Sequence, residues 1–185
     1  MLAVVVLAAL LVFAGAALTA RVDGASMTNG LRDGDALLLD RVGVRFQAPQ
    51  RGDVVVALQP NGVAAIKRVI GVPGDVLEID GAWRELGGTV TRPAVLLRPG
   101  GRGPWQRLVE PYVTAGWVVP GSCCDAQGRQ VTQGPSPVTV PADRFFLLGD
   151  SRDVSRDSRM FGLVPRDRIV GRARLLDTGP TLVPI

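Results

Sequence analysis

Short apolar runs that each follow a Gly-Asp pair constrain the fold of this chain more than any other feature. The pairs Gly34-Asp35, Gly52-Asp53 and Gly74-Asp75 precede runs at 36–39, 54–58 and 76–79. Gly-Asp is typical of turns, and short runs of aliphatic and β-branched residues are typical of strands. Residues 63–72, 145–148 and 168–176 add three more expected strands. No segment after residue 20 repeats apolar residues with helical spacing, so we predict a mainly β fold with antiparallel sheet.

Residues 1–20 form the longest apolar segment and contain no charged side chain. About 20 apolar residues in a helix span the hydrocarbon core of a bilayer, so we predict a single transmembrane anchor here. A cleaved secretory signal is the alternative, because Ala14-Gly15-Ala16 has the small-x-small form of a cleavage site. We favour the retained anchor, since no basic region precedes the apolar run and the run is long.

The composition changes between residues 81 and 140, where Gly, Pro and Arg dominate. We therefore predict a loop-rich subdomain at 81–140, inserted into a β-rich core formed by 21–80 and 141–185. The two cysteines of the chain, Cys123 and Cys124, lie in this insertion. Adjacent cysteines cannot supply four zinc ligands, and both a pair of thiols and a strained disulfide stay open.

Absent residue types exclude several classes of function. The chain has no histidine, which excludes a Ser-His-Asp triad and histidine metal sites. Its arginines are scattered and few aromatic residues accompany them, so we expect no nucleic-acid partner. The net charge of +4 favours at most weak attraction to an anionic membrane surface. We expect neither a metal nor a cofactor.

Lys67 is the only lysine among the 21 basic residues, and it lies in the apolar run 63–70. Arginine stays protonated in proteins, whereas a lysine in an apolar setting can lose its proton and act as a base. That role requires a pKa about two to three units below the ordinary value near 10.4. A stray lysine without function is the alternative explanation.

Two further segments carry polar groups suited to catalysis. Ser26 lies in a turn of small residues six positions after the apolar segment, and the dense polar cluster 149–159 follows the expected buried strand 145–148. Taken alone, the first is typical of a structural turn and the second of a solvated charged loop.

The order of these segments resembles the type I signal peptidases, especially those of Gram-positive and actinobacterial kind. The matching motifs are Ser26-Met27, Arg51 to Val55, Lys67 to Asp75, and Gly149 to Gly162, followed by Val164-Pro165 and Ile169 to Gly171. The resemblance covers nearly the whole chain and is weakest from 81 to 140. It implies a membrane-anchored β-rich serine endopeptidase with a Ser–Lys dyad.

The resemblance implies a role for each matching position. Ser26 attacks the scissile carbonyl, and Lys67 takes its proton and later helps to protonate the leaving amine. Ser155 orients the lysine. Asp157 and Arg159 form a structural polar pair, and Asp150 and Arg68 support the site. Substrate adds as an extended strand beside Val22, Asp23, Gly24 and Ala25 and beside Ala64, Ala65 and Ile66.

The implied function is removal of signal peptides from exported preproteins at the extracytoplasmic face of the cytoplasmic membrane. Two alternatives remain: a dedicated processing protease of the same superfamily, and a catalytically inactive, membrane-tethered peptide-binding domain. Three departures from the family pattern motivate the second, namely Gly24 where some members have an oxyanion serine, Asn29 for a proline, and Ser151 for an asparagine. The sequence leaves the oligomeric state open.

Overall fold

Two antiparallel sheets dominate the computed structural model, which describes residues 19–28, 30–80, 84–86, 89–91, 94–113 and 137–176. The seven-stranded sheet has the order β1 (Thr19–Arg21), β2 (Ala36–Asp40), β13 (Ile169–Leu175), β3 (Val54–Leu58), β4 (Ala64–Gly71), β11 (Arg144–Leu148) and β12 (Val164–Pro165). The four-stranded sheet has the order β10 (Val138–Thr139), β5 (Val76–Asp80), β8 (Ala94–Arg98) and β9 (Gln106–Arg107). The prediction of a mainly antiparallel β fold is confirmed.

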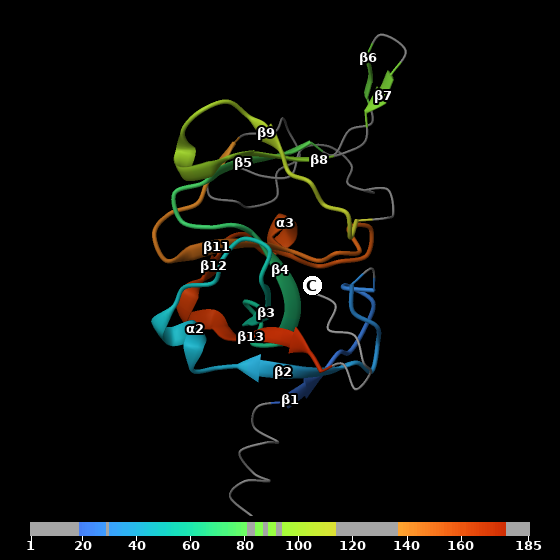
Figure 1. Ribbon diagram of the computed structural model, residues 1–185, viewed down its shortest axis with the longest axis vertical. Helices are drawn as coiled ribbons and strands as arrows, with labels where there is room; N and C mark the ends of the chain where they lie inside the picture. The colour runs from blue at the N-terminus through green and yellow to red at the C-terminus, as the bar shows by residue number, and fades with distance from the viewer. Residues whose placement is uncertain are drawn as a thin grey trace, which may run out of the picture.

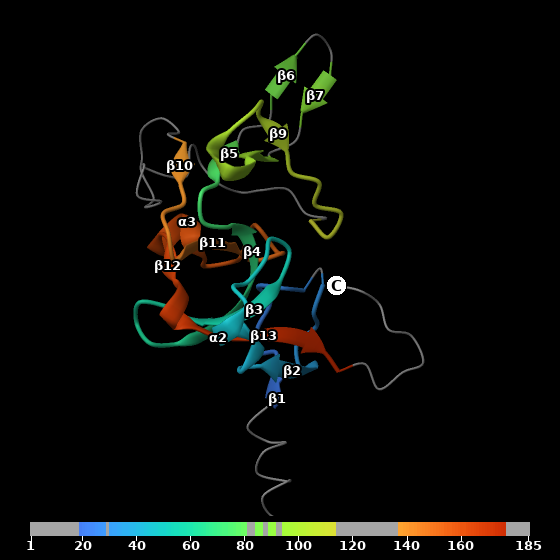
Figure 2. The same ribbon diagram turned by 60° about the vertical axis from the view of Figure 1, so that its left-hand side comes forward.

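The smaller sheet lies above the larger one in two views that differ by 60° (Figure 1, Figure 2). A hairpin of β6 (Arg84–Leu86) and β7 (Thr89–Thr91) projects beyond it. Helical structure in the described residues is limited to short elements: α2 (Gly43–Phe46), α3 (Ser158–Phe161) and the 3₁₀ turns η1 (Pro99–Gly101) and η2 (Arg166–Arg168). None of these helices is long and apolar enough to cross a membrane.

Several predictions concern residues outside the described part of the chain. The proposed anchor at 1–20 falls there except for its last two residues, Thr19 and Ala20, which belong to strand β1, so the predicted end of the anchor is wrong by these two residues. Cys123 and Cys124 fall outside the described residues as well. The division into a core and an insertion at 81–140 stays a prediction.

Each Gly-Asp pair folds as the same kind of turn before its strand. The glycine has a positive φ, and the aspartate carboxylate accepts a hydrogen bond from the backbone N–H three residues before it, which closes the turn. The three bonds join Arg32 to Asp35 at 2.7 Å, Gln50 to Asp53 at 2.8 Å, and Val72 to Asp75 at 2.8 Å. This local chemistry explains the repeated pattern in the sequence.

The core explains why several strands are apolar on both faces. Along β3, Val54 and Val56 pack into one buried cluster while Val55 and Ala57 pack into another. Strand β11 alternates in the same way, and its Phe146 and Leu148 join the cluster formed with the smaller sheet. A strand covered on both sides has an apolar run in place of the usual polar alternation.

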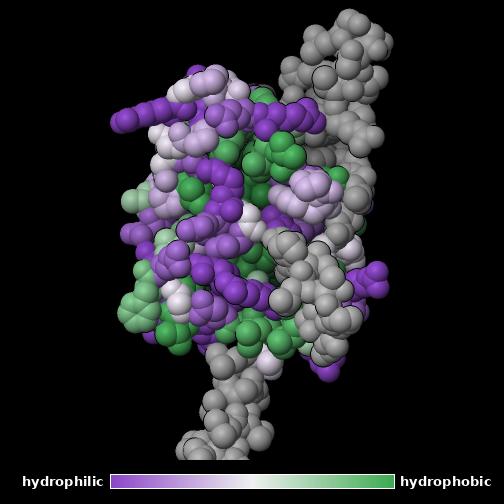
Figure 3. All heavy atoms as spheres, in the orientation of Figure 1, coloured by the Kyte–Doolittle hydropathy of each residue, from purple (hydrophilic) through white to green (hydrophobic). Residues whose placement is uncertain are grey.

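Among the apolar side chains that reach the surface, two lie close together near α2. On and beside α2, Val42 is 64% and Phe46 is 86% exposed. Figure 3 shows green atoms at the lower left, in the region that α2 occupies in Figure 1, among purple hydrophilic residues.

Candidate functional site

Ser26 and Lys67 meet beside strand β4 of the larger sheet. The Nζ of Lys67 donates a hydrogen bond to the Oγ of Ser26 over 2.8 Å. Lys67 lies within β4, and Ser26 lies in the turn that connects β1 to β2. Met27 and Leu31 anchor this turn in the core, with 1% and 0% exposure. The packing of the turn therefore holds the hydroxyl against the amine.

The surroundings of Lys67 favour its neutral form. Its side chain is 3% exposed, and desolvation is the main reason why its pKa is lowered from the ordinary value of 10.5. Arg159 lowers the pKa further, while Asp157 and Asp150 act against the shift. A neutral amine has a lone pair, so it can accept the proton of the Ser26 hydroxyl through the same contact.

A second turn, at residues 149–152, holds the backbone of Ser26 in place. The N–H of Ser151 donates to the carbonyl oxygen of Ser26 over 3.1 Å. The hydroxyl groups of Ser151 and Thr28 share a hydrogen bond of 2.6 Å, and Thr28 also donates to the carbonyl of Ala25 over 2.9 Å. Ser151, one of the departures from the family pattern, thus contacts the turn that carries the candidate nucleophile.

Asp157 and Arg159 form a buried fork at this second turn, that is, an ion pair joined by two parallel hydrogen bonds. Arg159 donates from Nε and from an NH2 group to the two carboxylate oxygens of Asp157, each over 2.8 Å. Asp157 also accepts from the N–H of Gly149 over 3.0 Å and caps the start of α3. The pair fixes the backbone at residue 149, close to Ser26.

Ser155 lies against Gly149 and is 7% exposed. Its Oγ has no hydrogen-bond partner among the residues that the structure describes. The bond to Lys67 that the resemblance implies is therefore not formed in this structure. The orienting role of Ser155 stays a prediction.

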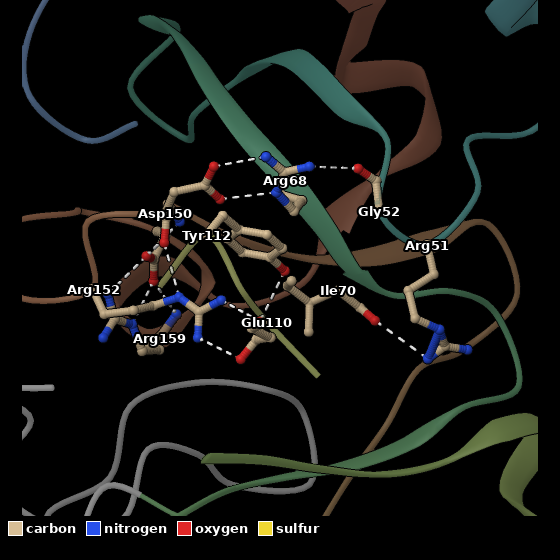
Figure 4. A network of polar contacts seen from close by, with 11 residues as sticks. Arg51, Gly52, Arg68, Ile70, Glu110, Tyr112, Asp150, Arg152 and Arg159 are labelled. Atoms are coloured by element: carbon tan, nitrogen blue, oxygen red, sulfur yellow. Dashed lines mark hydrogen bonds and ion pairs between the residues drawn. The ribbon is translucent and has the colours of Figure 1, made fainter. Parts of the chain in front are cut away.

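Arg68 and Asp150 form a second buried fork on the opposite face of β4 from Lys67. Two nitrogens of Arg68 donate to the two oxygens of Asp150 over 2.9 and 2.7 Å, and a third donates to the carbonyl of Gly52 over 2.9 Å. Figure 4 shows this fork with Tyr112 beside it. The pair joins the strand of Lys67 to the turn that holds Ser26.

A groove of about 450 Å³ runs past the Ser26–Lys67 contact. The residues predicted to bind substrate all line it: Val22, Asp23, Gly24, Ala25, Ala64, Ala65 and Ile66. On one side, Ala64 to Ile66 pair with β3. Strand β11 pairs with β4 only from Arg68 onward, so within the described residues the other edge of this stretch has no strand partner. An extended peptide fits such an edge.

Gly24 has a φ of +91°, a conformation that side chains other than glycine rarely adopt. Its N–H donates to Asp33 over 2.9 Å, which helps to hold this conformation. A serine would be strained in this conformation. Asn29, another departure, lies outside the described residues.

Replacing Gly24 with alanine is expected to lower the free energy of unfolding by about 1 kcal/mol, because alanine pays a steric cost at positive φ. Urea denaturation measures this change. Ala25→Ser is the matched control at an exposed neighbour, with an expected change within about 0.5 kcal/mol. Equal stability of the two variants would contradict the strain at residue 24.

Glu110 and Tyr112 belong to the same polar network and were not predicted from the sequence, whereas Arg152 lies in the predicted polar cluster 149–159 but had no role assigned to it. Arg152 is 1% exposed and bonds the carboxylate of Glu110. Two signals existed. Glu110 is the only acidic residue between residues 86 and 124, and Tyr112 is the only tyrosine of the chain. Neither signal indicates which distant residue is the partner.

Comparison with known proteins gives consistent matches. A family described as "Signal peptidase, peptidase S26" matches residues 1–176. Signal peptidase I of Leptolyngbya laminosa is 33% identical over 157 residues, which cover 80% of this chain and 62% of that protein. Signal peptidase IB of Staphylococcus aureus is 29% identical over 161 residues, covering 82% and 72%. The match therefore spans less than two thirds of the Leptolyngbya protein.

A solved structure of a signal peptidase I from Enterococcus faecalis is also similar. It is 27% identical, the match covers 68% of this chain and 97% of that chain, and the TM-score is 0.46.

Proposed function

We propose, from the premise that this chain belongs to the peptidase S26 family of signal peptidases, that it is a serine endopeptidase which removes signal peptides from exported preproteins. The contact of 2.8 Å between Lys67 Nζ and Ser26 Oγ carries this proposal. A buried lysine with a lowered pKa, hydrogen-bonded to a hydroxyl, is the arrangement that a lysine base requires.

In the proposed reaction, neutral Lys67 takes the proton of Ser26 as the Oγ attacks the scissile carbonyl carbon. The backbone N–H of Ser26 donates to the oxyanion that forms. The protonated lysine then gives its proton to the leaving amine, and an ester between Ser26 and the signal peptide remains. Water attacks this ester with Lys67 again acting as base, which releases the signal peptide and restores the serine.

The other site residues support this pair in the proposal. Asp157 with Arg159 and Asp150 with Arg68 hold the backbone on both sides of the dyad, as their forks indicate. Ser155 orients the amine of Lys67 once the site closes on substrate. Its buried hydroxyl has no other hydrogen-bond partner among the described residues, so this group can bond the amine of Lys67.

Membrane attachment also belongs to the proposal. The apolar segment that precedes strand β1 at Thr19 anchors the chain in the cytoplasmic membrane with a single pass, and the catalytic domain lies on the extracytoplasmic side. Strand β1 starts at Thr19, and Ala20 and Arg21 line the groove. The groove therefore begins within a few residues of the proposed anchor, close to the membrane surface where a signal peptide ends.

Cleavage of a purified preprotein by the full chain in detergent micelles tests the proposal. Substrate residues are numbered −1, −2 and −3 backward from the cleaved bond. Successive side chains of an extended peptide point to opposite sides, so those at −1 and −3 face the groove and the one at −2 faces away. Replacing alanine at −1 or −3 with leucine is expected to lower kcat/KM by about 10- to 100-fold, since small pockets do not hold the larger side chain. Mass spectrometry of the new N-terminus identifies the cut.

The same alanine-to-leucine change at −2 is the matched control and is expected to have little effect. A panel of unrelated preproteins separates a general signal peptidase from a dedicated processing protease. Failure to cleave any of them would reject the proposed function and favour the inactive peptide-binding alternative.

A further inference from the structure

The turn at residues 110–112 packs against the segments that carry the candidate dyad. It follows β9 of the smaller sheet, whereas Ser26 and Lys67 belong to the larger sheet. Figure 4 shows Glu110 facing Arg152, and the ring of Tyr112 lying beside Arg68. The two sheets are therefore joined by charged groups next to the dyad as well as by the apolar core.

Glu110 holds Arg152 through both of its carboxylate oxygens. NH1 of Arg152 donates to Oε2 over 3.0 Å, and NH2 donates to Oε1. Nε of the same guanidinium donates to the carbonyl of Gly149 over 2.9 Å. A planar guanidinium held on both sides fixes the backbone that it bonds. Glu110 thus contributes to holding the turn at 149–152 in place, together with Asp157 and Arg68.

That turn is hydrogen-bonded to the backbone of Ser26, whose side chain is the candidate nucleophile. Ser151, next to Arg152, donates its N–H to the carbonyl of Ser26 over 3.1 Å. Two short steps, from Glu110 to Arg152 and from Ser151 to Ser26, therefore connect the smaller sheet to the candidate nucleophile.

Tyr112 connects the same turn to the strand of Lys67. Its ring centroid lies 4.1 Å from Cζ of Arg68, and its hydroxyl donates to Glu110 over 3.0 Å. Burial, and then the charge of Glu110, raise the pKa of Tyr112, so the hydroxyl keeps its proton at neutral pH. Arg68 is in turn held by Asp150, next to Ser151.

We infer that Glu110, Tyr112 and Arg152 form a latch that positions Ser26 against Lys67. The inference rests on the proposed function, because it assigns the latch to that reaction. Outside the latch, the contacts described above reach the carbonyl of Gly149 and the guanidinium of Arg68, and through these the latch acts as a set of positioning residues. They act on the rate of the chemical step by holding the turn at 149–152 and the strand at Arg68 in register.

The latch predicts a specific kinetic signature for Glu110→Gln. This change keeps the shape of the side chain and removes the charge that pairs with buried Arg152. We expect kcat to fall about 10- to 100-fold while KM stays within about twofold, since a small displacement of reacting groups has effects of this size. Acylation of Ser26 by a β-lactam-type probe should slow by the same factor.

Companion variants separate a latch from a general loss of stability. Arg152→Met should match Glu110→Gln, and the double variant should be no slower than the slower single one, because the three residues act as a unit. Tyr112→Phe keeps the ring over Arg68, so its kcat should fall only a few-fold.

Arg51→Met is the control. It breaks the ion pair of 2.9 Å with Asp75, which also joins the two sheets. The described bonds of Arg51 go to Asp75 and to the carbonyl of Ile70, neither of which belongs to the latch or the dyad. Its kcat should stay near that of the wild type.

The outcomes distinguish the latch from the proposed function. An active wild type with kcat of Glu110→Gln within twofold would overturn the latch alone. A rise in KM at constant kcat would also overturn it and would assign the turn to substrate binding. Where Glu110→Gln does not fold, as thermal melting shows, Tyr112→Phe decides, and wild-type kcat for it overturns the latch. A wild type that neither cleaves nor acylates would instead reject the proposed function.

Discussion

Replacing Lys67 with arginine is expected to abolish preprotein cleavage, lowering kcat by at least about 10³-fold, although the positive charge is kept. Arginine does not release its proton in a protein, so it cannot take the proton of Ser26. The buried environment that makes Lys67 a base would not convert a guanidinium into one. Cleavage of a preprotein under single-turnover conditions measures the effect.

Ser26→Ala gives the background cleavage rate for this measurement, because it removes the attacking oxygen and leaves the groove intact. Lys67→Arg should fall to nearly the same background rate, and a thermal melt should show both variants folded. A wild-type rate in Lys67→Arg would reject the lysine base, since charge alone would then suffice.

The pH dependence follows from the same group. Burial lowers the pKa of Lys67 below 10.5. Below the lowered pKa the amine is protonated and inactive, so kcat/KM should rise as pH increases through that pKa and then level off. The residual kcat/KM of Lys67→Arg should not rise with pH in this way. A wild-type profile that is flat from pH 5 to 9 would contradict titration of the lysine base.

The sequence predicted those parts of the fold and site that local chemistry determines. The Gly-Asp turns fix the starts of three strands through bonds within three residues, so their positions were visible in the pattern. Lys67 was recognisable because it is the only lysine and lies in an apolar strand, and the structure confirms its burial.

Contacts between distant segments could not be predicted in the same way. Glu110 and Arg152 are 42 residues apart, and nothing in either neighbourhood specifies the other. Strands β9, β10 and β12 have two residues each, too few for a periodic pattern to appear. The polar cluster 149–159 was interpretable as a solvated loop, and only tertiary packing buries Asp150, Arg152, Asp157 and Arg159.

Gly149 provides the second large prediction, because the closeness of Ser26 and Ser155 depends on its missing side chain. A Cβ at this position would lie 2.6 Å from the carbonyl oxygen of Ser26 and 2.5 Å from the Cβ of Ser155. The carbonyl cannot move freely, since it accepts the N–H of Ser151. Gly149→Ala is therefore expected to lower stability by about 1–3 kcal/mol and kcat by about 100-fold or more.

The double variant Gly149→Ala/Ser155→Gly separates the two collisions. Removing the side chain of residue 155 relieves the contact with Ser155, so urea denaturation should show part of the stability restored. The collision with the Ser26 carbonyl remains, so kcat should stay well below that of Ser155→Gly alone, because the nucleophile is still displaced from Lys67. Equal kcat in these two variants would mean that the backbone at residue 149 does not position Ser26, and that the close approach seen there serves packing only.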